Sequence, residues 1–461
     1  MKNINEKKIE GLLSKAKCAS AEKIEAILEK SRTLKRLSLQ ESAVLLSVDD
    51  PALLKEIFEA ATFVKNAVYG ARVVLFAPLY ISNFCVNACL YCAFKSDNGL
   101  IKRKALSTDE IRQEVRWLLE RGHKRILLVA GESAPTGETP IEHYVRAVKA
   151  IYSVSVGKHK IKRVNINCAP LSVAEFRQLK AAGIGTYQIF QETYHEKTYR
   201  VVHPGGPKSD PDNRLDAVAR AFHAGIDDVG IGVLYGLYDY KFETLAMLSH
   251  IEHLERKFKV GPHTISVPRI EPAVGVDFTK DMPHRVSDED FKKVVAVLRL
   301  SVPYTGLILS TRETSALRDE LFDLGVSQVS AESKTSPGGY SSLDGKNEAQ
   351  FCLSDRRSLD EVVGSLISKN LIPSFCAACY RKQRTGEAFM SLAKPGTIKG
   401  KCALNALITL KEYLDDFASP QVKCAGYRLI ERARCALDQN SKEQLSRFFA
   451  AVQEGKRDIY V

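Results

Sequence analysis

Two groups of three closely spaced cysteines distinguish this sequence of 461 residues. Cys85, Cys89 and Cys92 follow the pattern Cys-x3-Cys-x2-Cys, which places three thiolates on one short loop. Three thiolates can ligate three irons of a 4Fe-4S cubane and leave the fourth iron open to another ligand. A closed zinc site normally takes four ligands, so this triplet predicts an iron–sulfur cluster rather than structural zinc.

The second group consists of Cys376, Cys379 and Cys402, a Cys-x2-Cys pair followed after 22 residues by a third cysteine. This spacing predicts a second 4Fe-4S cluster with one open iron. A structural zinc ion is the alternative, although the sequence offers no fourth ligand nearby. The other five of the eleven cysteines are expected to behave as small hydrophobic residues.

The cysteine content and the first residues together predict a cytoplasmic protein. Residues 1–17 are charged and contain no apolar signal-peptide region. The cytosol keeps thiols reduced, which favours cluster ligation over disulfides. No apolar run approaches the roughly 18 residues of a membrane span, so no membrane association is expected. The formal net charge of +12 is accompanied by no nucleic-acid motif, so we expect no nucleic-acid partner.

An alternation of short apolar runs and amphipathic segments begins at residue 71. The eight apolar runs, interpreted as strands, are Arg72–Ile81, Arg125–Ala130, Arg163–Cys168, Thr186–Gln191, Asp228–Leu234, His263–Pro268, Gly306–Ser310 and Gly325–Ala331. The segments expected to be helices include Thr108–Arg121, Val173–Ala182, Arg214–Ala224, Phe242–Phe258 and Asp288–Leu300. Eight strands alternating with helices predict an α/β fold, a (β/α)8 barrel of the TIM type.

The remaining residues flank this barrel. Residues 1–70 have helical periodicity and predict a helical N-terminal extension, and residues 71–335 are assigned to the barrel. Residues 336–461 are expected to form a mostly helical C-terminal domain that binds the auxiliary cluster, with helices at Leu359–Lys369, Ala403–Phe417 and Gln421–Ala436. The polar, glycine- and serine-rich stretch Thr335–Arg356 predicts a linker or an ordered loop.

The first triplet directly follows the first predicted strand, and its spacing resembles the signature of the radical S-adenosylmethionine (SAM) superfamily. In that superfamily the open iron binds SAM, and the cluster supplies the electron that releases a 5′-deoxyadenosyl radical. The resemblance implies that Tyr91 lies near the adenine. Gly131 and Glu132, after the second strand, resemble the family's Gly-Gly-Glu motif that binds the SAM amino group, with Ala130 in place of the first glycine.

The resemblance assigns roles to two more strands. Glu192, at the end of the fourth strand, matches a glutamate that binds the ribose hydroxyls in close relatives. Gly230 and Gly232 resemble a glycine-bearing strand that packs on the adenine. A glutamate at a strand end can also be a mere surface charge. Two of them at carboxyl ends of barrel strands, where barrel active sites lie, favour ligand binding.

The two triplets together resemble the HydG family of FeFe-hydrogenase maturases over essentially the whole chain. This resemblance implies a radical SAM lyase that cleaves L-tyrosine to p-cresol and dehydroglycine. It further implies that dehydroglycine is converted to carbon monoxide and cyanide, which are captured on an additional Fe(II), possibly with bound cysteine, beside the auxiliary cluster. Other hydrogenase maturases are the implied acceptors of the product.

Three residues between the two predicted clusters complete the expected site. His263 opens the sixth strand at the face opposite the SAM site, and the resemblance makes it a ligand of the additional iron. Arg312 follows the seventh strand, and its planar guanidinium suits the tyrosine carboxylate. A salt bridge to Glu313 is the alternative for Arg312. Ser330, on the eighth strand, resembles a hydroxyl that assists this arginine in related lyases.

Two other functions are consistent with parts of the sequence. The first is a ThiH-like 2-iminoacetate (dehydroglycine) synthase of thiamine biosynthesis, which would stop at dehydroglycine and use its C-terminal cysteines structurally. The second is an iron–sulfur carrier without radical chemistry. The constellation of Glu132, Glu192 and Arg312 argues against a carrier, because a carrier needs no pocket for SAM or an amino acid.

Overall fold

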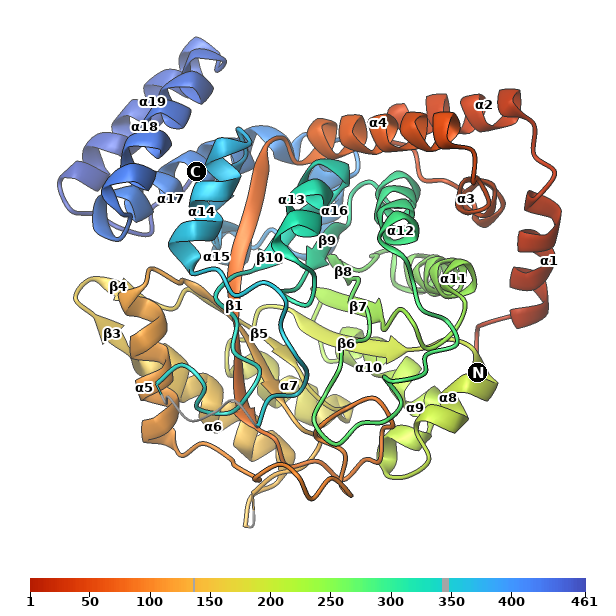
Figure 1. Ribbon diagram of the computed structural model, residues 1–461. Helices are drawn as coiled ribbons and strands as arrows, with labels where there is room; N and C mark the ends of the chain where they lie inside the picture. Colours follow the sequence, from red (N-terminus) through yellow and green to blue (C-terminus); the bar gives the residue numbers. More distant parts are fainter. Residues whose placement is uncertain (136, 342–347) are drawn as a thin grey trace.

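The computed structural model describes residues 1–135, 137–341 and 348–461 (Figure 1). Eight parallel strands follow one another around a closed barrel, because the last strand pairs with the first at Val74 and Gln328. These strands are β1 (Arg72–Ser82), β2 (Arg125–Ala130), β5 (Arg163–Asn167), β6 (Tyr187–Glu192), β7 (Val229–Val233), β8 (Thr264–Ser266), β9 (Gly306–Leu309) and β10 (Val326–Ser330). The predicted barrel is therefore confirmed.

Helices surround the barrel on its outer face. They are α5 (Thr108–Glu120), α6 (Pro140–Ser153), α7 (Val173–Ala181), α8 (Glu196–Val202), α9 (Pro211–Leu215), α10 (Ala217–His223), α11 (Tyr240–Phe258), α12 (Asp288–Ser301) and α13 (Ser315–Leu324). The predicted helix Arg214–Ala224 is wrong at its start: the structure begins α9 at Pro211, because Asp210 accepts hydrogen bonds from the first free backbone amides.

Four helices precede the barrel, as the periodicity of residues 1–70 predicts. They are α1 (Glu6–Ala16), α2 (Ala21–Arg32), α3 (Leu39–Leu46) and α4 (Pro51–Val68). Ser38 and Glu41 form a capping box at the start of α3, and Asp50 caps α4 just before Pro51. Helix α4 packs on α12 and α13, so this segment covers one flank of the barrel.

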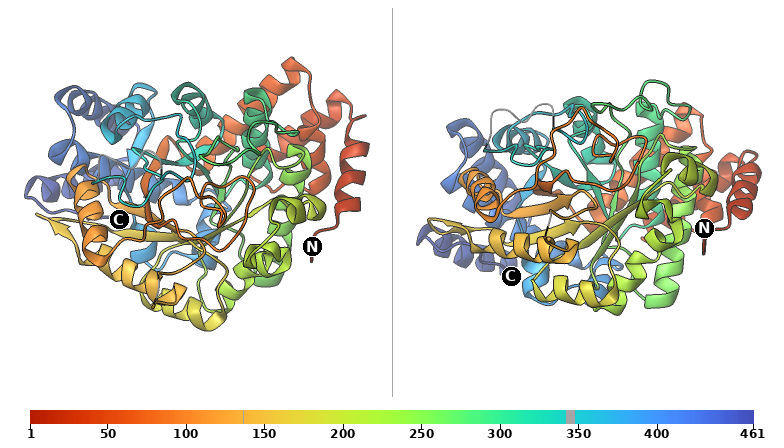
Figure 2. Two further views of the ribbon diagram at one scale, coloured as in Figure 1. Left: turned by 60° about the horizontal axis from the view of Figure 1, so that its bottom comes forward. Right: turned by 90° about the horizontal axis from the view of Figure 1, so that it is seen from below.

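The C-terminal residues contribute α14 (Leu359–Ser368), α15 (Ala378–Arg381), α16 (Gly386–Ala393), α17 (Ile398–Asp416), α18 (Pro420–Cys435) and α19 (Gln439–Gln453). In both views of Figure 2, the last helices lie on the flank opposite the N-terminal ones. Among the described residues, no helix is long and apolar enough to cross a membrane.

The sequence analysis missed β11 (Ile372–Ser374), which adds to the barrel sheet as a ninth strand beside β1. Its first amide donates to the carbonyl of Ala71 at 2.8 Å, and residues 372–374 pair in parallel with Arg72–Val74. Three residues carry too little periodicity to be recognised as a strand. Cys376 follows two residues after this pairing, and its carbonyl accepts a hydrogen bond from Arg125 at the start of β2. A short hairpin, β3 (Ser155–Val156) with β4 (His159–Lys160), was also missed.

A buried ion pair joins the barrel to the C-terminal helices. Lys124, just before β2, donates to Glu412 of α17, and the two side chains are only 5% and 1% exposed. The other oxygen of Glu412 accepts from the backbone amide of Asp458 at 2.7 Å. A buried pair is most costly when one partner is removed, because the other charge stays desolvated.

We therefore expect Lys124→Met to lower the free energy of unfolding by roughly 3–5 kcal/mol. Chemical denaturation monitored by circular dichroism measures the change. The double variant Lys124→Met, Glu412→Leu is the matched control and should recover part of the loss, since no unpaired charge remains. Equal stability of the single variant and the unmodified protein would show that the pair does not hold the helices to the barrel.

Candidate functional site

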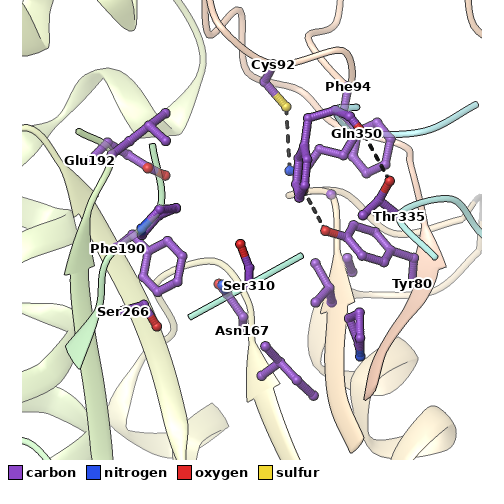
Figure 3. Close-up of a pocket in the computed structure, with 18 of the residues that line it drawn as sticks. Tyr80, Cys92, Phe94, Asn167, Phe190, Glu192, Ser266, Ser310, Thr335 and Gln350 are labelled. Atoms are coloured by element: carbon purple, nitrogen blue, oxygen red, sulfur yellow. Dashed lines mark hydrogen bonds between the residues drawn. The ribbon is translucent and has the colours of Figure 1, made fainter. Parts of the chain in front are cut away.

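A cavity of about 1370 Å³, counted out to its open mouth, occupies the end of the barrel at which the strands finish. Cys85, Cys89 and Cys92 all line it, and they lie on the loop that follows β1. Figure 3 shows Glu192, Phe190 and Ser266 on one side of the cavity and Cys92 on the other, with Asn167 and Ser310 between the two sides.

The cysteine loop is buried, and this decides the state of its thiols. Burial raises the pKa of Cys89 to about 12 and also raises the pKa of Cys92. Such thiols stay protonated at neutral pH unless a metal supplies positive charge, because a coordinating thiol is deprotonated outright. The Asn87 side-chain amide donates to Cys85 Sγ at 3.6 Å. The donor set and the burial therefore fit an iron–sulfur cluster.

Two carboxylates that line the cavity are held by two buried cations. Arg214 donates to Glu132 at 2.7 Å, and Lys208 donates to Glu192 at 2.7 Å. Burial raises the pKa of Glu132, but Arg214 and Lys208 outweigh it, so this pKa lies below its ordinary value. Glu132 is therefore ionised at neutral pH. Sequence reasoning missed both cations, because Lys208 lies in a short turn before α9 and Arg214 lies in α9, and neither residue belongs to a recognised motif.

Glu192 adopts a left-handed backbone conformation, with φ of 68°. Non-glycine residues rarely adopt this conformation, and those that do cluster at ligand sites. The turn that follows is fixed by the buried Glu243 of α11, which accepts from the amide of Tyr194 at 2.8 Å and from the Thr193 hydroxyl. The strained backbone thus aims the carboxylate of Glu192 into the cavity.

Two of the predicted glycine positions are sterically required. A Cβ at Gly131 would lie 2.1 Å from the carbonyl oxygen of Phe84, so only glycine lets the residues after β2 approach the cysteine loop. A Cβ at Gly232 would lie 3.0 Å from the ring of Phe190, which lines the cavity. Gly230 lies deeper in the barrel, against Gln188 and Thr264. Tyr91 lines the cavity, and its hydroxyl is 2.8 Å from His203.

Arg312 and Ser330 line the same cavity on the side of β9 and β10. Glu313, the alternative partner of Arg312, pairs instead with Arg269, whose Nε lies 3.1 Å from both carboxylate oxygens. The guanidinium of Arg312 lies 3.4 Å from the ring centre of Phe351 and donates to the Arg269 carbonyl at 3.3 Å. In the described part of the chain no salt bridge engages Arg312, so its charge is available to an anionic ligand.

A second cavity, of about 580 Å³, lies at the amino ends of the strands. Cys376, Cys379 and Cys402 line it together with His263, which the sequence analysis expected at the face opposite the SAM site. Cys402 lies in the first turns of α17 and Cys376 lies just after β11, so tertiary structure unites the triplet. Burial raises the pKa of Cys379 to about 12, so metal ligation is again needed to ionise the thiol.

The second cavity is strongly basic. Arg72, Arg125 and Arg163 line it. Arg125 and Arg163 are buried and Arg72 is half-buried, and the Nε atoms of Arg72 and Arg125 have no hydrogen-bond partner among the described residues. Burial lowers the pKa of Arg163 to about 9 and that of Arg125 to about 10. A buried guanidinium is stabilised by an anion, so the cavity fits a group of net negative charge, such as a thiolate-ligated cluster.

His263 is held in one orientation. Its Nδ1 lies 3.2 Å from a carboxylate oxygen of Asp228, and its ring packs on Phe389 at 4.2 Å between ring centres. Burial lowers the pKa of His263 to about 4, so the ring is neutral at pH 7. The carboxylate fixes the proton on Nδ1 and leaves Nε2 as a lone-pair donor, the arrangement common for metal-binding histidines. Asp228 was not identified from the sequence.

The two cavities approach each other inside the barrel. On β1, Phe76 lines the first cavity and Val74 lines the second. On β10, Ser330 lines the first cavity and Gln328 lines the second. Across the described residues, no three His, Cys, Asp or Glu side chains converge on the position of a single metal ion.

Comparisons with known proteins agree with this architecture. Residues 79–250 match the Radical SAM superfamily, and residues 266–372 match the Biotin and Thiamin Synthesis associated domain. The chain is 31% identical over 353 residues to 2-iminoacetate synthase of Escherichia coli K12, covering 76% of this chain and 90% of that protein.

Two solved structures are similar over nearly the full length. A crystal structure of HydG, described as a maturase of the [FeFe]-hydrogenase, is 47% identical with a TM-score of 0.96, and both chains are covered completely. HydG from Carboxydothermus hydrogenoformans is 40% identical with a TM-score of 0.83, covering 96% of this chain and 97% of that one. The fold and site thus define a radical SAM enzyme, which uses a 4Fe-4S cluster and SAM. Within that superfamily, the chain belongs to the family that contains 2-iminoacetate synthase and HydG.

Proposed function

We propose that this protein is a radical SAM lyase that cleaves L-tyrosine to p-cresol and dehydroglycine, and then forms carbon monoxide and cyanide on an iron for assembly of the FeFe-hydrogenase active site. The observation that carries the proposal is the pair of cysteine triplets, each lining its own cavity at one end of a single barrel. The full-length similarity to HydG supports it, because that similarity includes the C-terminal residues of the second triplet.

In the first cavity, Cys85, Cys89 and Cys92 would hold the 4Fe-4S cluster. When bound, the cluster and SAM supply a 5′-deoxyadenosyl radical for hydrogen abstraction. Glu132 is ionised and suits the SAM amino group, and the strained Glu192 is aimed where its carboxylate would accept hydrogen bonds from the ribose hydroxyls. Tyr91 would bound the adenine.

Gly230 and Gly232 were also expected to pack on the adenine of SAM. The closeness of Phe190 to Gly232 supports a contribution through this ring, with glycine providing the room that the ring needs. Gly230 would act deeper, by letting Gln188 and Thr264 pack.

Arg312 would bind the tyrosine carboxylate, assisted by the hydroxyl of Ser330. The half-buried guanidinium lies on the face of Phe351 and pairs with no carboxylate in the described residues, so an incoming carboxylate would gain a charge-assisted hydrogen bond. Fixing the carboxylate at one end would orient the amino group of tyrosine toward the centre of the cavity.

In the second cavity, Cys376, Cys379 and Cys402 would hold a second 4Fe-4S cluster, and His263 would ligate an additional Fe(II), possibly with bound cysteine. The neutral His263 with a carboxylate on Nδ1 supports this assignment. The basic lining would attract dehydroglycine, the product of tyrosine cleavage that carries a carboxylate, into the cavity.

The proposal also includes the organisation of the chain and its partners. We propose an N-terminal extension at 1–70, a barrel at 71–335 and an auxiliary-cluster domain at 336–461, with β11 of the last part completing the sheet. Tyrosine and SAM are the substrates, and other hydrogenase maturases in the cytoplasm are the acceptors of the iron product.

A ThiH-like 2-iminoacetate synthase is the second candidate, supported by the 31% identity to that enzyme. That similarity covers 76% of the chain, whereas the similarity to HydG covers all of it. The presence of both cavities favours the longer reaction. Iron and sulfide analysis separates the two functions: two clusters and extra iron support the first, and one cluster supports the second.

Replacing Cys89 with Ala should abolish SAM cleavage. A cubane that lacks one of its three protein ligands does not present its open iron correctly to SAM. Anaerobic assay of 5′-deoxyadenosine with dithionite measures the loss. Cys18→Ala is the matched control, because Cys18 is exposed and far from both cavities. Undiminished 5′-deoxyadenosine formation by Cys89→Ala would contradict the radical SAM assignment of this triplet.

Arg312→Lys should weaken tyrosine binding roughly ten- to a hundredfold, since removing a hydrogen bond to a charged group costs about 1.5–3 kcal/mol. Lysine keeps the charge but loses the planar fork and its contact with Phe351. Isothermal calorimetry gives the affinities for tyrosine and SAM, and the affinity for SAM should change little. An unchanged affinity for tyrosine would show that the tyrosine carboxylate binds at another residue.

The double variant Cys376→Ala, Cys379→Ala should release p-cresol but lose carbon monoxide and hydrogenase maturation. Tyrosine cleavage depends on the first cavity, and the iron product depends on the second. Cys424→Ala, Cys435→Ala is the matched control, because both cysteines are exposed on α18. A folded double variant that makes no p-cresol would show that the two sites are not separable. Full iron product would show that the second triplet is only structural.

A further inference from the structure

The segment after the barrel contributes Gln350 to the first cavity, although the sequence predicted only a linker or loop there. The Gln350 backbone is fixed at both ends: its amide donates to the carbonyl of Thr335 at 2.9 Å, and its carbonyl accepts from Ala93 at 3.4 Å. Ala93 directly follows Cys92. The segment is therefore tied to the cysteine loop itself, and Figure 3 shows Gln350 between Cys92, Thr335 and Tyr80.

The side chain of Gln350 has one orientation. The Tyr80 hydroxyl donates to Oε1 at 2.8 Å, and Nε2 lies 3.6 Å from Cys92 Sγ. A thiolate can only accept hydrogen bonds, so the amide nitrogen must be the end that faces it. Tyr80 is buried and comes from β1, a rigid element, and it holds the opposite end of the amide. The donor is thus pre-positioned by the barrel.

We propose that Gln350 is a positioning residue for the first cluster, one that sets the reduction potential of the cluster by donating a hydrogen bond to the Cys92 sulfur. This inference rests on the proposed ligation of the cluster by Cys85, Cys89 and Cys92. Reduction adds negative charge that is shared by the sulfur ligands. A donor to one of these sulfurs stabilises the reduced form more than the oxidised form and raises the potential.

The other amide donor of the cavity is placed differently. Asn87 reaches Cys85 Sγ at 3.6 Å, but the same Nδ2 donates to Glu132 at the shorter distance of 2.7 Å. The amide nitrogen of Asn87 is therefore shared between a carboxylate and a sulfur. The amide nitrogen of Gln350 has no acceptor other than the Cys92 sulfur among the described residues, so it is directed at the cluster ligand alone.

The position of Gln350 also links the cluster to the expected tyrosine site. The ring of Phe351, the next residue, stacks against Arg312, with 3.4 Å between the ring centre and the guanidinium carbon. The Phe351 carbonyl accepts from the Thr335 hydroxyl at 3.2 Å, so the two consecutive residues share one anchor. One short segment thus contacts both a cluster ligand and the residue that would hold the substrate carboxylate.

The test is a redox titration of the reconstituted protein, followed by the electron paramagnetic resonance signal of the first cluster. The second triplet is replaced by Cys376→Ala, Cys379→Ala in every sample, so that one cluster contributes. Gln350→Leu removes the donor, and Gln350→Glu keeps the acceptor for Tyr80 but loses the donor. Gln113→Leu is the matched control, because Gln113 is exposed on α5.

We expect a more negative midpoint potential in both Gln350 variants and an unchanged potential in Gln113→Leu. A merely structural role would change the melting temperature without moving the potential. An unchanged midpoint in a cluster-loaded Gln350→Leu protein would overturn the inference, and if that variant does not load a cluster, an unchanged midpoint in Gln350→Glu overturns it equally. If the parent sample shows no cluster signal at all, the proposed ligation fails instead.

Discussion

The closure of eight parallel strands into a barrel is the constraint on which both sites depend. Closure through β1 and β10 leaves no free edge inside the molecule, so every inward side chain faces a space bounded by all strands. Successive inward positions on one strand then belong to different cavities: Val74 and Phe76 on β1 are two residues apart and line opposite ones. The length of the strands therefore sets the separation between the two centres. Small products of the first site reach the second most directly through the barrel interior.

Burial of charge gives the two ends different chemistry. At the mouth, Glu132 and Glu192 are each matched by a cation, so the wall is close to neutral before a ligand arrives. At the other end, Arg72, Arg125 and Arg163 face three cysteines and the neutral His263. Desolvated guanidinium groups are costly unless an anion meets them, so this end favours a thiolate-ligated cluster and anionic small ligands. One scaffold therefore provides a neutral pocket for a zwitterionic substrate and a basic pocket for anionic products.

The sequence predicted the barrel, the helical flanks and both cysteine triplets, because these features are written as local periodicity and spacing. It also placed Glu132, Glu192, Arg312 and His263 at the correct ends of their strands. In a parallel barrel all strands end at the same face, so the position of a residue at a strand end determines the face on which it lies. It missed Lys208, Arg214, Asp228 and Gln350, which belong to no recognised motif and reach the site only through tertiary structure. It missed β11 for the same reason: three residues have no period, and their pairing with β1 depends on the folded barrel.

The distance between the two clusters tests the central claim most directly. Tyr80 at the mouth and Val74 at the other end are six residues apart on β1, which is about 20 Å at a rise of 3.3 Å per residue. Tyr80 donates to Gln350, whose amide reaches Cys92, and the hydroxyl of Ser374, the residue paired with Val74, accepts from the amide of Cys376. Pulsed electron paramagnetic resonance on the reduced, fully reconstituted protein should therefore give two interacting clusters separated by about 20 Å. A separation well below one strand length, or a single cluster in a fully loaded sample, would contradict a barrel with one centre at each end.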